Sequence, residues 1–287
     1  MSDEPRHAVA RLRQDLRTSG HDGFDAHRDE LPAVLRDALA EPEAAVALFA
    51  DVWPVVPADT DEAWSRGLLD LGAELAAALP TSLLLATGFR RAATSLRGQG
   101  ALRLAALAGM RELAIHRLRD DDPDAAAGAL HDLAATYRAQ GRMHKVVGCA
   151  DEVLELYLLH GDRPGTARAL EHLGALMIEV GRHDSAITYL SRADRLFEDL
   201  ADPAGRARCL PELGRALWLS GNRAEAHRRF NRALALLIGT DDTAAQRVRD
   251  LVAELQAGPR SVPEPVHQGD ADLDQQADDE ADPGQDG

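Results

Sequence analysis

The chain has 287 residues, enough for one large domain or two ordinary ones, and 45% hydrophobic residues suffice for a sizeable core. Its 52 alanines and its 4% of aromatic residues favour closely packed helices and exclude an all-β fold. The formal charge of −16 argues against general nucleic-acid binding, because neutralising phosphates requires a surplus of arginine and lysine. Two cysteines are too few for disulfides to stabilise a chain of this length. We find neither a leader peptide nor an uninterrupted apolar run of about 18 residues. We therefore expect a cytoplasmic protein that does not span a membrane.

Residues 1–80 are expected to form a short N-terminal arm, residues 1–27, and a helical extension, residues 28–80. In the arm, His21 and His27 flank a glycine-rich stretch with Asp22 and Asp25. These residues do not have the spacing of metal ligands, so the stretch is predicted to be an exposed connector. In the extension, apolar residues and turn signals predict helices. These are expected over residues 31–52, as two short helices broken at Pro42, and over residues 61–79.

Residues 81–121 are predicted to form a helix hairpin that is a degenerate copy of a unit repeated downstream. Gly100 stands near the expected turn, and Ala106 and Leu113 occupy small and apolar columns of the repeat. Terminal units of repeat arrays are commonly atypical in sequence. The array is therefore expected to begin in this segment.

Residues 122–240 contain three segments of equal length that superpose without gaps, and one glycine in each segment marks the period. Apolar positions recur at spacings of three and four on both sides of this shared glycine, so each segment is expected to be two helices joined at that glycine, which can adopt positive φ. An aspartate with a nearby proline supplies a start signal before each unit. The aligned columns include Gly141, Gly181 and Gly221; Leu130, Leu170 and Leu210; Leu133, Leu173 and Leu213; Ala134, Gly174 and Gly214; and Ala150, Leu190 and Phe230.

Two further segments follow the repeats. Residues 241–257 carry an aspartate cap signal and one apolar stripe, which predict a capping helix that closes the stack. Residues 258–287 contain nine acidic residues against one arginine, a net charge of −8 that is half of the total. With few large aliphatic residues, this segment is predicted to be a disordered acidic tail.

The repeat unit resembles the tetratricopeptide repeat. Leu-Gly, an apolar residue, and then Gly, Ala, Phe and Ala recur in the third unit at that family's spacing. The 40-residue unit is longer than the family's usual length of about 34, and it lacks the family's early Trp and closing Pro. It is similar to the repeats at the C-terminal end of bacterial signal-transduction ATPases and antibiotic-biosynthesis regulators. The residues that carry the resemblance are Leu213, Gly214, Leu217, Gly221, Ala226, Phe230 and Ala233.

This resemblance implies an all-α, right-handed α-solenoid of tetratricopeptide-like helix hairpins over residues 122–240, with a helical N-terminal extension. Residues 28–80 are similar to the helical stretch that precedes the repeats in those regulators. The phosphate-binding loop of the ATPases, Gly-x-x-x-x-Gly-Lys-Ser/Thr, does not occur. The chain is therefore expected to correspond to the interaction portion of such proteins.

No constellation of residues predicts catalysis. The eleven histidines include no His-Glu-x-x-His spacing, and Cys149 and Cys209 are far apart in the sequence. No nucleophile elbow or dinucleotide-binding glycine motif is present. We expect no metal, no cofactor and no enzymatic activity.

The repeat does supply a candidate binding surface. Helical geometry puts one set of positions in the first helix of each unit beside the inward-facing columns, and in the family this concave face holds a peptide or a partner helix. Four arginines against one glutamate predict a basic groove, in which arginine binds carboxylates and tryptophan anchors an apolar side chain. Alternatively, the arginines are an ordinary solvated face and the tryptophan packs on the capping helix. The candidate residues are His131, Arg138, Arg168, Glu171, Ile178, Arg208, Arg215 and Trp218.

The leading hypothesis is a non-enzymatic helical-repeat adaptor or regulator that mediates protein–protein interaction through this groove. A role in transcriptional or signalling control rests on family analogy alone. The alternative is a sensor that binds a short signalling peptide in the groove and changes its superhelical curvature. A further hypothesis places the acidic tail in the basic groove, in competition with the partner.

Overall fold

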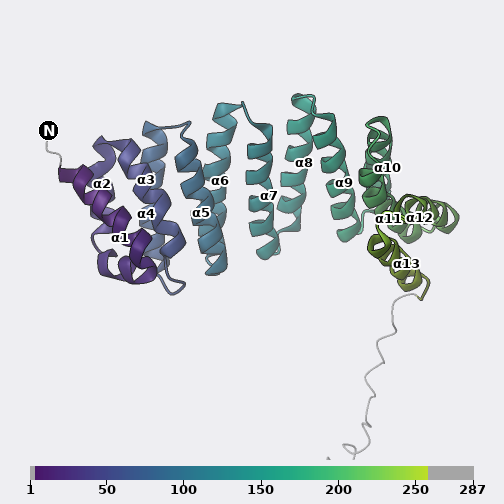
Figure 1. The fold of residues 1–287 in the computed structure, drawn as a ribbon, viewed down its shortest axis with the longest axis horizontal. Coiled ribbons are helices and arrows are strands. Elements are labelled where there is room, and N and C mark those ends of the chain that lie inside the picture. Colours follow the sequence, from purple (N-terminus) through teal and green to yellow (C-terminus); the bar gives the residue numbers. More distant parts are fainter. Residues whose placement is uncertain (1–3, 258–287) are drawn as a thin grey trace, which may run out of the picture.

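The computed structural model describes residues 4–257, which form a row of helices stacked side by side (Figure 1). No β-strand occurs in this range, and the predicted all-α solenoid of helix hairpins is confirmed. The predicted acidic tail, residues 258–287, lies outside the described residues. The helices are α1 (Glu4–His27), α2 (Leu31–Asp37), α3 (Pro42–Val52), α4 (Glu62–Ala78), α5 (Leu83–Gly98), α6 (Leu102–Arg119), α7 (Pro123–Ala139), α8 (Met143–Leu159), α9 (Arg163–Glu179), α10 (His183–Asp199), α11 (Pro203–Leu219), α12 (Arg223–Leu237) and α13 (Asp242–Ala257), with the short 3₁₀ helices η1 (Ala38–Ala40) and η2 (Trp53–Val55).

The predicted hairpins are α7–α8, α9–α10 and α11–α12, which we number repeat units 1 to 3, with α5–α6 before them. The glycine at each turn has positive φ, as the column of glycines predicts. The values are 71° at Gly141, 73° at Gly181, 90° at Gly221 and 81° at Gly100. A left-handed residue ends the first helix of each hairpin and lets the chain reverse.

An aspartate caps the first helix of each unit. Asp162 accepts a hydrogen bond from the amide of Gly165 at 2.9 Å, and Asp202 accepts one from the amide of Gly205 at 2.8 Å. Asp122 makes the corresponding bond in unit 1. These caps satisfy amides that have no partner within the helix, which fixes where α7, α9 and α11 begin.

Pro211 lies inside α11, which begins at Pro203. A proline within a helix would be expected to delay the start of the helix to about residue 210, but α11 starts seven residues earlier. The Asp202 cap and packing against α10 and α12 hold the first turns in place. Because Pro211 has no N–H, the carbonyl of Ala207 is left without its usual helical donor.

Small and large residues alternate across each hairpin, so that the two helices interdigitate. A Cβ added at Gly174 would lie 2.4 Å from Leu190 Cγ, and one added at Gly214 would lie 2.6 Å from Phe230 Cε1. Real side chains do not approach so closely, so in units 2 and 3 this column must hold glycine opposite a large residue. The hairpins of units 2 and 3 are therefore matched in shape, as the aligned columns suggest.

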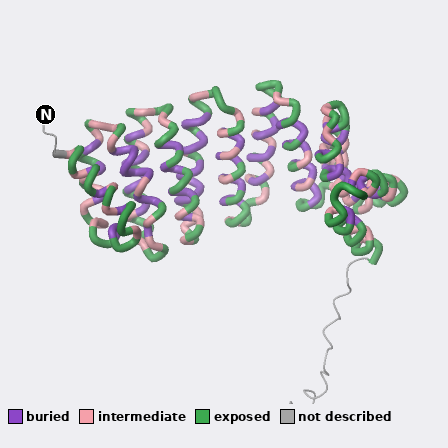
Figure 2. Tube along the Cα trace, viewed as in Figure 1, coloured by how far each residue is buried: buried purple, intermediate pink, exposed green. Residues whose placement is uncertain are grey.

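Buried residues run along the whole row of helices (Figure 2). They form two cores that meet at α6. Leu104, Ala105 and Ile115 of α6 join the core of α1–α5, whereas Ala106 and Leu113 join the core of α7–α13. α6 thus packs on both sides, as a helix inside a solenoid does. The N-terminal extension is continuous with the repeats through this helix.

Residues 4–27 differ from the expected arm and exposed connector, because they form the helix α1. Its buried Val9, Leu12 and Leu16 recur at helical spacing and join the N-terminal core. Phe24 is also fully buried, and Gly20, at φ 58°, kinks the helix between them. The glycines of this segment therefore shape a helix that packs on α3 rather than a loop.

Two ionisable residues are buried in α6 near α7. Glu112 is fully buried; its Oε1 accepts a hydrogen bond from Arg90 Nε at 2.6 Å, and its Oε2 has no hydrogen-bond partner. His116 Nε2 lies 3.9 Å from the same Oε1. When the turn glycines of the hairpins are aligned, these positions correspond to Val153 and Tyr157 of unit 1. The degenerate hairpin therefore carries a polar pair where the other units are apolar.

We predict opposite contributions of these two groups to the pH dependence of stability. Burial raises the pKa of Glu112 above its usual 4.5, so stability falls as the pH rises from that value through the folded-state pKa. Burial, and then Arg90, lower the pKa of His116 below 6.5, so stability rises with pH up to that value. Denaturant unfolding at stepped pH should show a steeper rise of the unfolding free energy between about pH 5 and 6.5 in Glu112→Gln, and a flatter or falling curve in His116→Gln, by up to about 1.4 kcal/mol per pH unit. Parallel curves for all three proteins would contradict this account.

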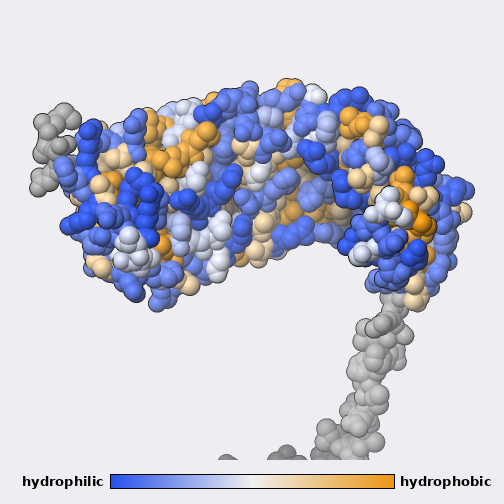
Figure 3. Space-filling view, in the orientation of Figure 1, coloured by the Kyte–Doolittle hydropathy of each residue, from blue (hydrophilic) through white to orange (hydrophobic). Residues whose placement is uncertain are grey.

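The row of helices bends at its C-terminal end. α11, α12 and α13 turn away from the direction of the preceding helices, and the surface is hollowed on the inner side of the bend (Figures 1 and 3). α13 contacts α12 and, over fewer residues, α11. The predicted capping helix is thus present at the end of the row, but it leaves part of α11 uncovered.

Candidate functional site

The first helices of the three units, α7, α9 and α11, form a surface that we call the first-helix face. Three contacts link these helices across the units. The rings of His131 and His172 lie 5.7 Å apart, and Arg138 Nη1 lies 2.6 Å from Glu179 Oε2. Arg208 Nη2 of α11 lies 3.2 Å from Glu171 Oε2 of α9. The face is therefore a connected surface over three units.

The structure distributes the eight candidate residues unevenly. His131, Arg138, Arg168 and Arg208 are exposed, and Glu171 is half-buried beside Arg208. Ile178 is only 5% exposed and belongs to the core, so it cannot contact a partner directly. Its position in the sequence pattern corresponds to Arg138 and Trp218, but in unit 2 the side chain packs between helices.

The predicted excess of positive charge is largely neutralised on this face. Arg138 pairs with Glu179, Arg208 with Glu171, and Arg215 Nη1 lies 3.4 Å from Glu212 Oε2. Burial raises the pKa of Glu171, and Arg208 opposes that rise. The partners of the arginines come from neighbouring helices or the adjoining turn, so the face is a mosaic of ion pairs rather than a basic groove.

Trp218 lies at the far end of α11 from the cap. Its ring makes an edge-to-face contact with His227 of α12, with centroids 5.5 Å apart, and the guanidinium of Arg223 lies 5.1 Å from its centroid. The indole is therefore engaged within the α11–α12 hairpin. Neither the predicted role as a groove anchor nor the alternative contact with α13 matches these neighbours.

An apolar recess of about 740 Å³ lies between α11, the end of α12 and α13. It opens because α13 covers only part of α11. Arg208 lines this recess, which connects the recess to the first-helix face. Ala207 and Pro211 line it as well, and the carbonyl of Ala207 lacks the helical donor that Pro211 cannot supply. The lining residues are Pro203, Ala204, Ala207, Arg208, Pro211, Glu212, Leu236, Leu237, Thr240, Asp241, Ala244, Arg247, Val248 and Leu251.

Of the candidate residues, only Arg208 lines the recess. Few features of the sequence indicate the recess. They are the small residues Ala204, Ala207 and Ala244, the proline within α11, and the apolar stripe of α13. Recesses of this kind, apolar with a few polar groups at the margin, are typical sites for an inserted side chain or small ligand. The recess is therefore the most distinct binding feature of this face.

The remaining reactive groups have environments that favour a structural role. Burial raises the pKa of Cys149 to about 11 and raises that of Cys209 further, so both thiols stay protonated near neutral pH. Residues 4–257 contain no cluster of three or more potential metal ligands. None of the helices in that range is long and apolar enough to cross a membrane.

These features define a helical-repeat protein with an open face on its first helices. Residues 124–199 match the family model of the tetratricopeptide repeat. The match covers the hairpins α7–α8 and α9–α10 apart from Pro123. Unit 3, whose residues carry the sequence resemblance most clearly, lies outside it. No curated protein matches the chain in sequence.

Several solved structures resemble this chain. Aspartyl phosphate phosphatase F from Bacillus subtilis is 11% identical with a TM-score of 0.53, over 90% of this chain and 71% of that one. Kinesin light chain repeats from Podosopora anserina are 17% identical with a TM-score of 0.49, over 77% of this chain and 99% of that one. A signal-transduction ATPase with a tetratricopeptide repeat sensor from Pyrococcus horikoshii is 11% identical with a TM-score of 0.40, over 90% of this chain and 53% of that one. At these identities, the likeness to the phosphatase establishes the α-solenoid fold and nothing more specific.

Proposed function

We propose that this chain is a non-enzymatic adaptor or regulator of the cytoplasm that binds a partner protein on its first-helix face. Tetratricopeptide repeats imply a protein partner. The apolar recess beside Arg208 carries the more specific part of the proposal, because it offers a place for one or two apolar side chains at the end of a polar face. The ion pairs across α7, α9 and α11 connect the units and leave polar atoms for the rim of an interface.

The partner contributes an apolar anchor flanked by polar residues. The anchor enters the recess against Val248 and Leu251, and its backbone N–H reaches the carbonyl of Ala207. Arg208 and Arg247 lie at the recess and select for carboxylates nearby. Control of transcription or signalling is part of the proposal by family analogy alone.

Filling the recess tests this function. Ala204 is exposed, is the second residue of α11 and lines the recess, so Ala204→Phe blocks it without burying a charge. We expect this variant to lose the partner by at least about tenfold in affinity, which corresponds to about 1.4 kcal/mol. The matched control is Ala224→Phe, since Ala224 is also exposed, is the second residue of α12 and lies outside the recess.

Quantitative affinity capture from the native lysate, followed by mass spectrometry, measures the effect. A folded protein that is held by the native chain and by Ala224→Phe, but not by Ala204→Phe, supports the adaptor. A short peptide with the same dependence supports the peptide-sensing alternative, which the size of the recess also allows. Equal capture by both variants would show that the recess takes no part.

A further inference from the structure

The second helices of the hairpins, α6, α8, α10 and α12, form a separate surface that we call the second-helix face. Ion pairs bridge successive helices of this face at corresponding positions. Arg117 of α6 pairs with Glu152 of α8, and Glu198 of α10 lies 4.0 Å from Arg232 of α12. Arg117 and Glu198 stand in one column of the repeat alignment, and Glu152 and Arg232 stand in another. The bridging ion pair therefore recurs along the solenoid. At the α6–α8 junction the first helix supplies the arginine, and at the α10–α12 junction it supplies the glutamate.

The bridge is missing between α8 and α10. The residue that corresponds to Glu198 is Leu158, which is 51% exposed, and the residue that corresponds to Arg232 is Arg192. Arg192 and its neighbour Arg195 are both exposed, and neither has an ion-pair partner within residues 4–257. This junction therefore presents two uncompensated positive charges beside an exposed leucine.

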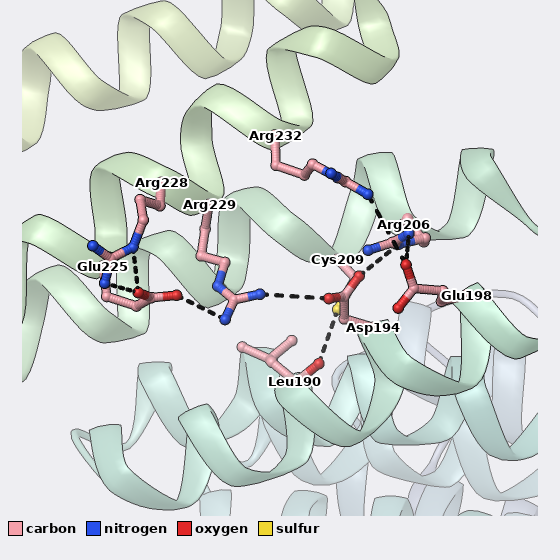
Figure 4. Close-up of polar contacts among 9 residues, drawn as sticks. All are labelled: Leu190, Asp194, Glu198, Arg206, Cys209, Glu225, Arg228, Arg229 and Arg232. Carbon is pink, nitrogen blue, oxygen red and sulfur yellow. Dashed lines mark hydrogen bonds and ion pairs between the residues drawn. The ribbon is translucent and has the colours of Figure 1, made fainter.

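The floor of the same junction is also open. Between α10 and α12, Arg206 is held by Asp194 at 2.9 Å and by Glu198 at 2.5 Å, and its side chain is largely buried (Figure 4). One unit earlier, the same positions hold Thr166 in place of Arg206 and Leu154 in place of Asp194.

With these smaller and apolar residues, a groove of about 370 Å³ remains between α8 and α10. Leu158, Thr166, Leu170 and Leu196 line it, with Arg192 and Arg195 beside them. Arg163 also lines the groove, but it is paired with Asp199 at 3.1 Å.

We propose that this α8–α10 groove binds an acidic amphipathic segment of a partner protein. Such a segment brings carboxylates to Arg192 and Arg195, as Glu198 does for Arg232 one groove further on, and it places an aliphatic side chain on the leucine floor. Charge complementarity favours an acidic occupant, because Arg192 and Arg195 line one apolar groove and neither has an ion-pair partner among the described residues. A bare phosphate backbone would leave the leucines uncovered.

The site is distinct from the first-helix face. Its lining comes from α8, α9 and α10, and it shares no residue with the recess between α11 and α13. The solenoid can therefore hold two partners, or two segments of one partner, at two separate places on its surface. This arrangement goes beyond a single-groove adaptor.

Fluorescence anisotropy with the full chain tests the proposal. The probe is a labelled helix-forming peptide with glutamates on one side and leucines on the other. Leu158→Glu supplies from within the chain the bridging carboxylate that this junction lacks at the position of Glu198, so it pairs with Arg192 and repels the probe. We expect this variant to weaken binding at least about tenfold while its thermal midpoint stays at or above that of the native protein. The matched control is Leu118→Glu, which makes the same charge change at the 65% exposed Leu118 near the end of α6 and should leave binding unchanged.

Other outcomes would overturn the assignment. Equal losses for Leu118→Glu and Leu158→Glu would mean that only net charge matters. Tighter binding by a synthetic peptide of residues 258–287 would make the chain's own acidic segment the occupant. Binding of single-stranded DNA with the same dependence on Leu158→Glu would identify a polyanion site. Loss of the peptide in Arg208→Glu alone would place it on the first-helix face.

Discussion

Substituting leucine for Asp194 is expected to lower the free energy of unfolding by about 3 kcal/mol. Asp194 is 5% exposed and lies where α10, α11 and α12 meet. Its carboxylate is 2.9 Å from Arg206 Nε and 3.7 Å from Arg229 Nη1 (Figure 4). The equivalent positions hold Leu154 in unit 1 and Leu234 in unit 3, so a leucine at position 194 should fit the packing. The expected loss of stability therefore comes from removing the buried counter-ion of Arg206.

The double variant Asp194→Leu with Arg206→Thr separates charge from packing. It introduces the residues that occupy the same positions one unit earlier, Leu154 and Thr166, and it removes both members of the buried pair. Replacing a complete buried pair is often neutral, so we expect the double variant to recover about 2 kcal/mol of the loss. Guanidinium chloride unfolding followed by far-ultraviolet circular dichroism measures both proteins. If the double variant is no more stable than Asp194→Leu, the pair is not the source of the effect.

The periodic columns predict much of this fold because each column has one steric task. Only glycine adopts the positive φ of the turns at low cost, and only glycine fits opposite Leu190 and Phe230, so these positions recur at a fixed spacing. The same reasoning finds the aspartate caps. It does not find α1, where Gly20 interrupts the helical pattern between Leu16 and Phe24 and imitates a loop.

The ion pairs and the recess of the candidate site could not be predicted from the sequence. A column of the repeat alignment contains equivalent residues of the three units. The two members of an ion pair between neighbouring units belong to different columns, because successive helices of the superhelix are shifted relative to one another. Arg138 pairs forward with Glu179, and Arg208 pairs backward with Glu171. An alignment at the repeat period therefore shows the arginines without their carboxylates. The recess depends on how far α13 covers α11, and no repeating column encodes that angle.

The second-helix face shows how departures from periodicity carry information. Ion pairs bridge α6 to α8 and α10 to α12 at equivalent positions. At the junction between them, α8–α10, the equivalent residues are Leu158 and Arg192, which cannot form such a pair. A solenoid has no need for uniform junctions, because each hairpin contacts only its neighbours. One junction can therefore lose its ion pair and gain a binding role without affecting the packing of the others.

Replacing Gly174 by alanine is expected to lower the free energy of unfolding by about 2 to 3 kcal/mol. The new Cβ would lie 2.4 Å from Leu190 Cγ and 2.8 Å from its Cδ2, and Leu190 is fully buried, so the α9–α10 hairpin must open to accept it. The matched control is Gly148→Ala in α8, where nothing lies within 4 Å of the added Cβ. There the lower backbone entropy of the unfolded chain should raise stability by about 0.5 to 1 kcal/mol.

The contrast between these two substitutions isolates close packing from helix propensity. Both exchange glycine for alanine inside a helix of the repeat array, so propensity alone would make both stabilising. The tight contact at Gly174 reverses the sign only if α9 and α10 approach as closely as the column of Ala134, Gly174 and Gly214 implies. Thermal and denaturant unfolding of the two variants measure the difference. A gain in stability for Gly174→Ala would show that the hairpin can relax at this position, and that the small column does not set the spacing of the solenoid.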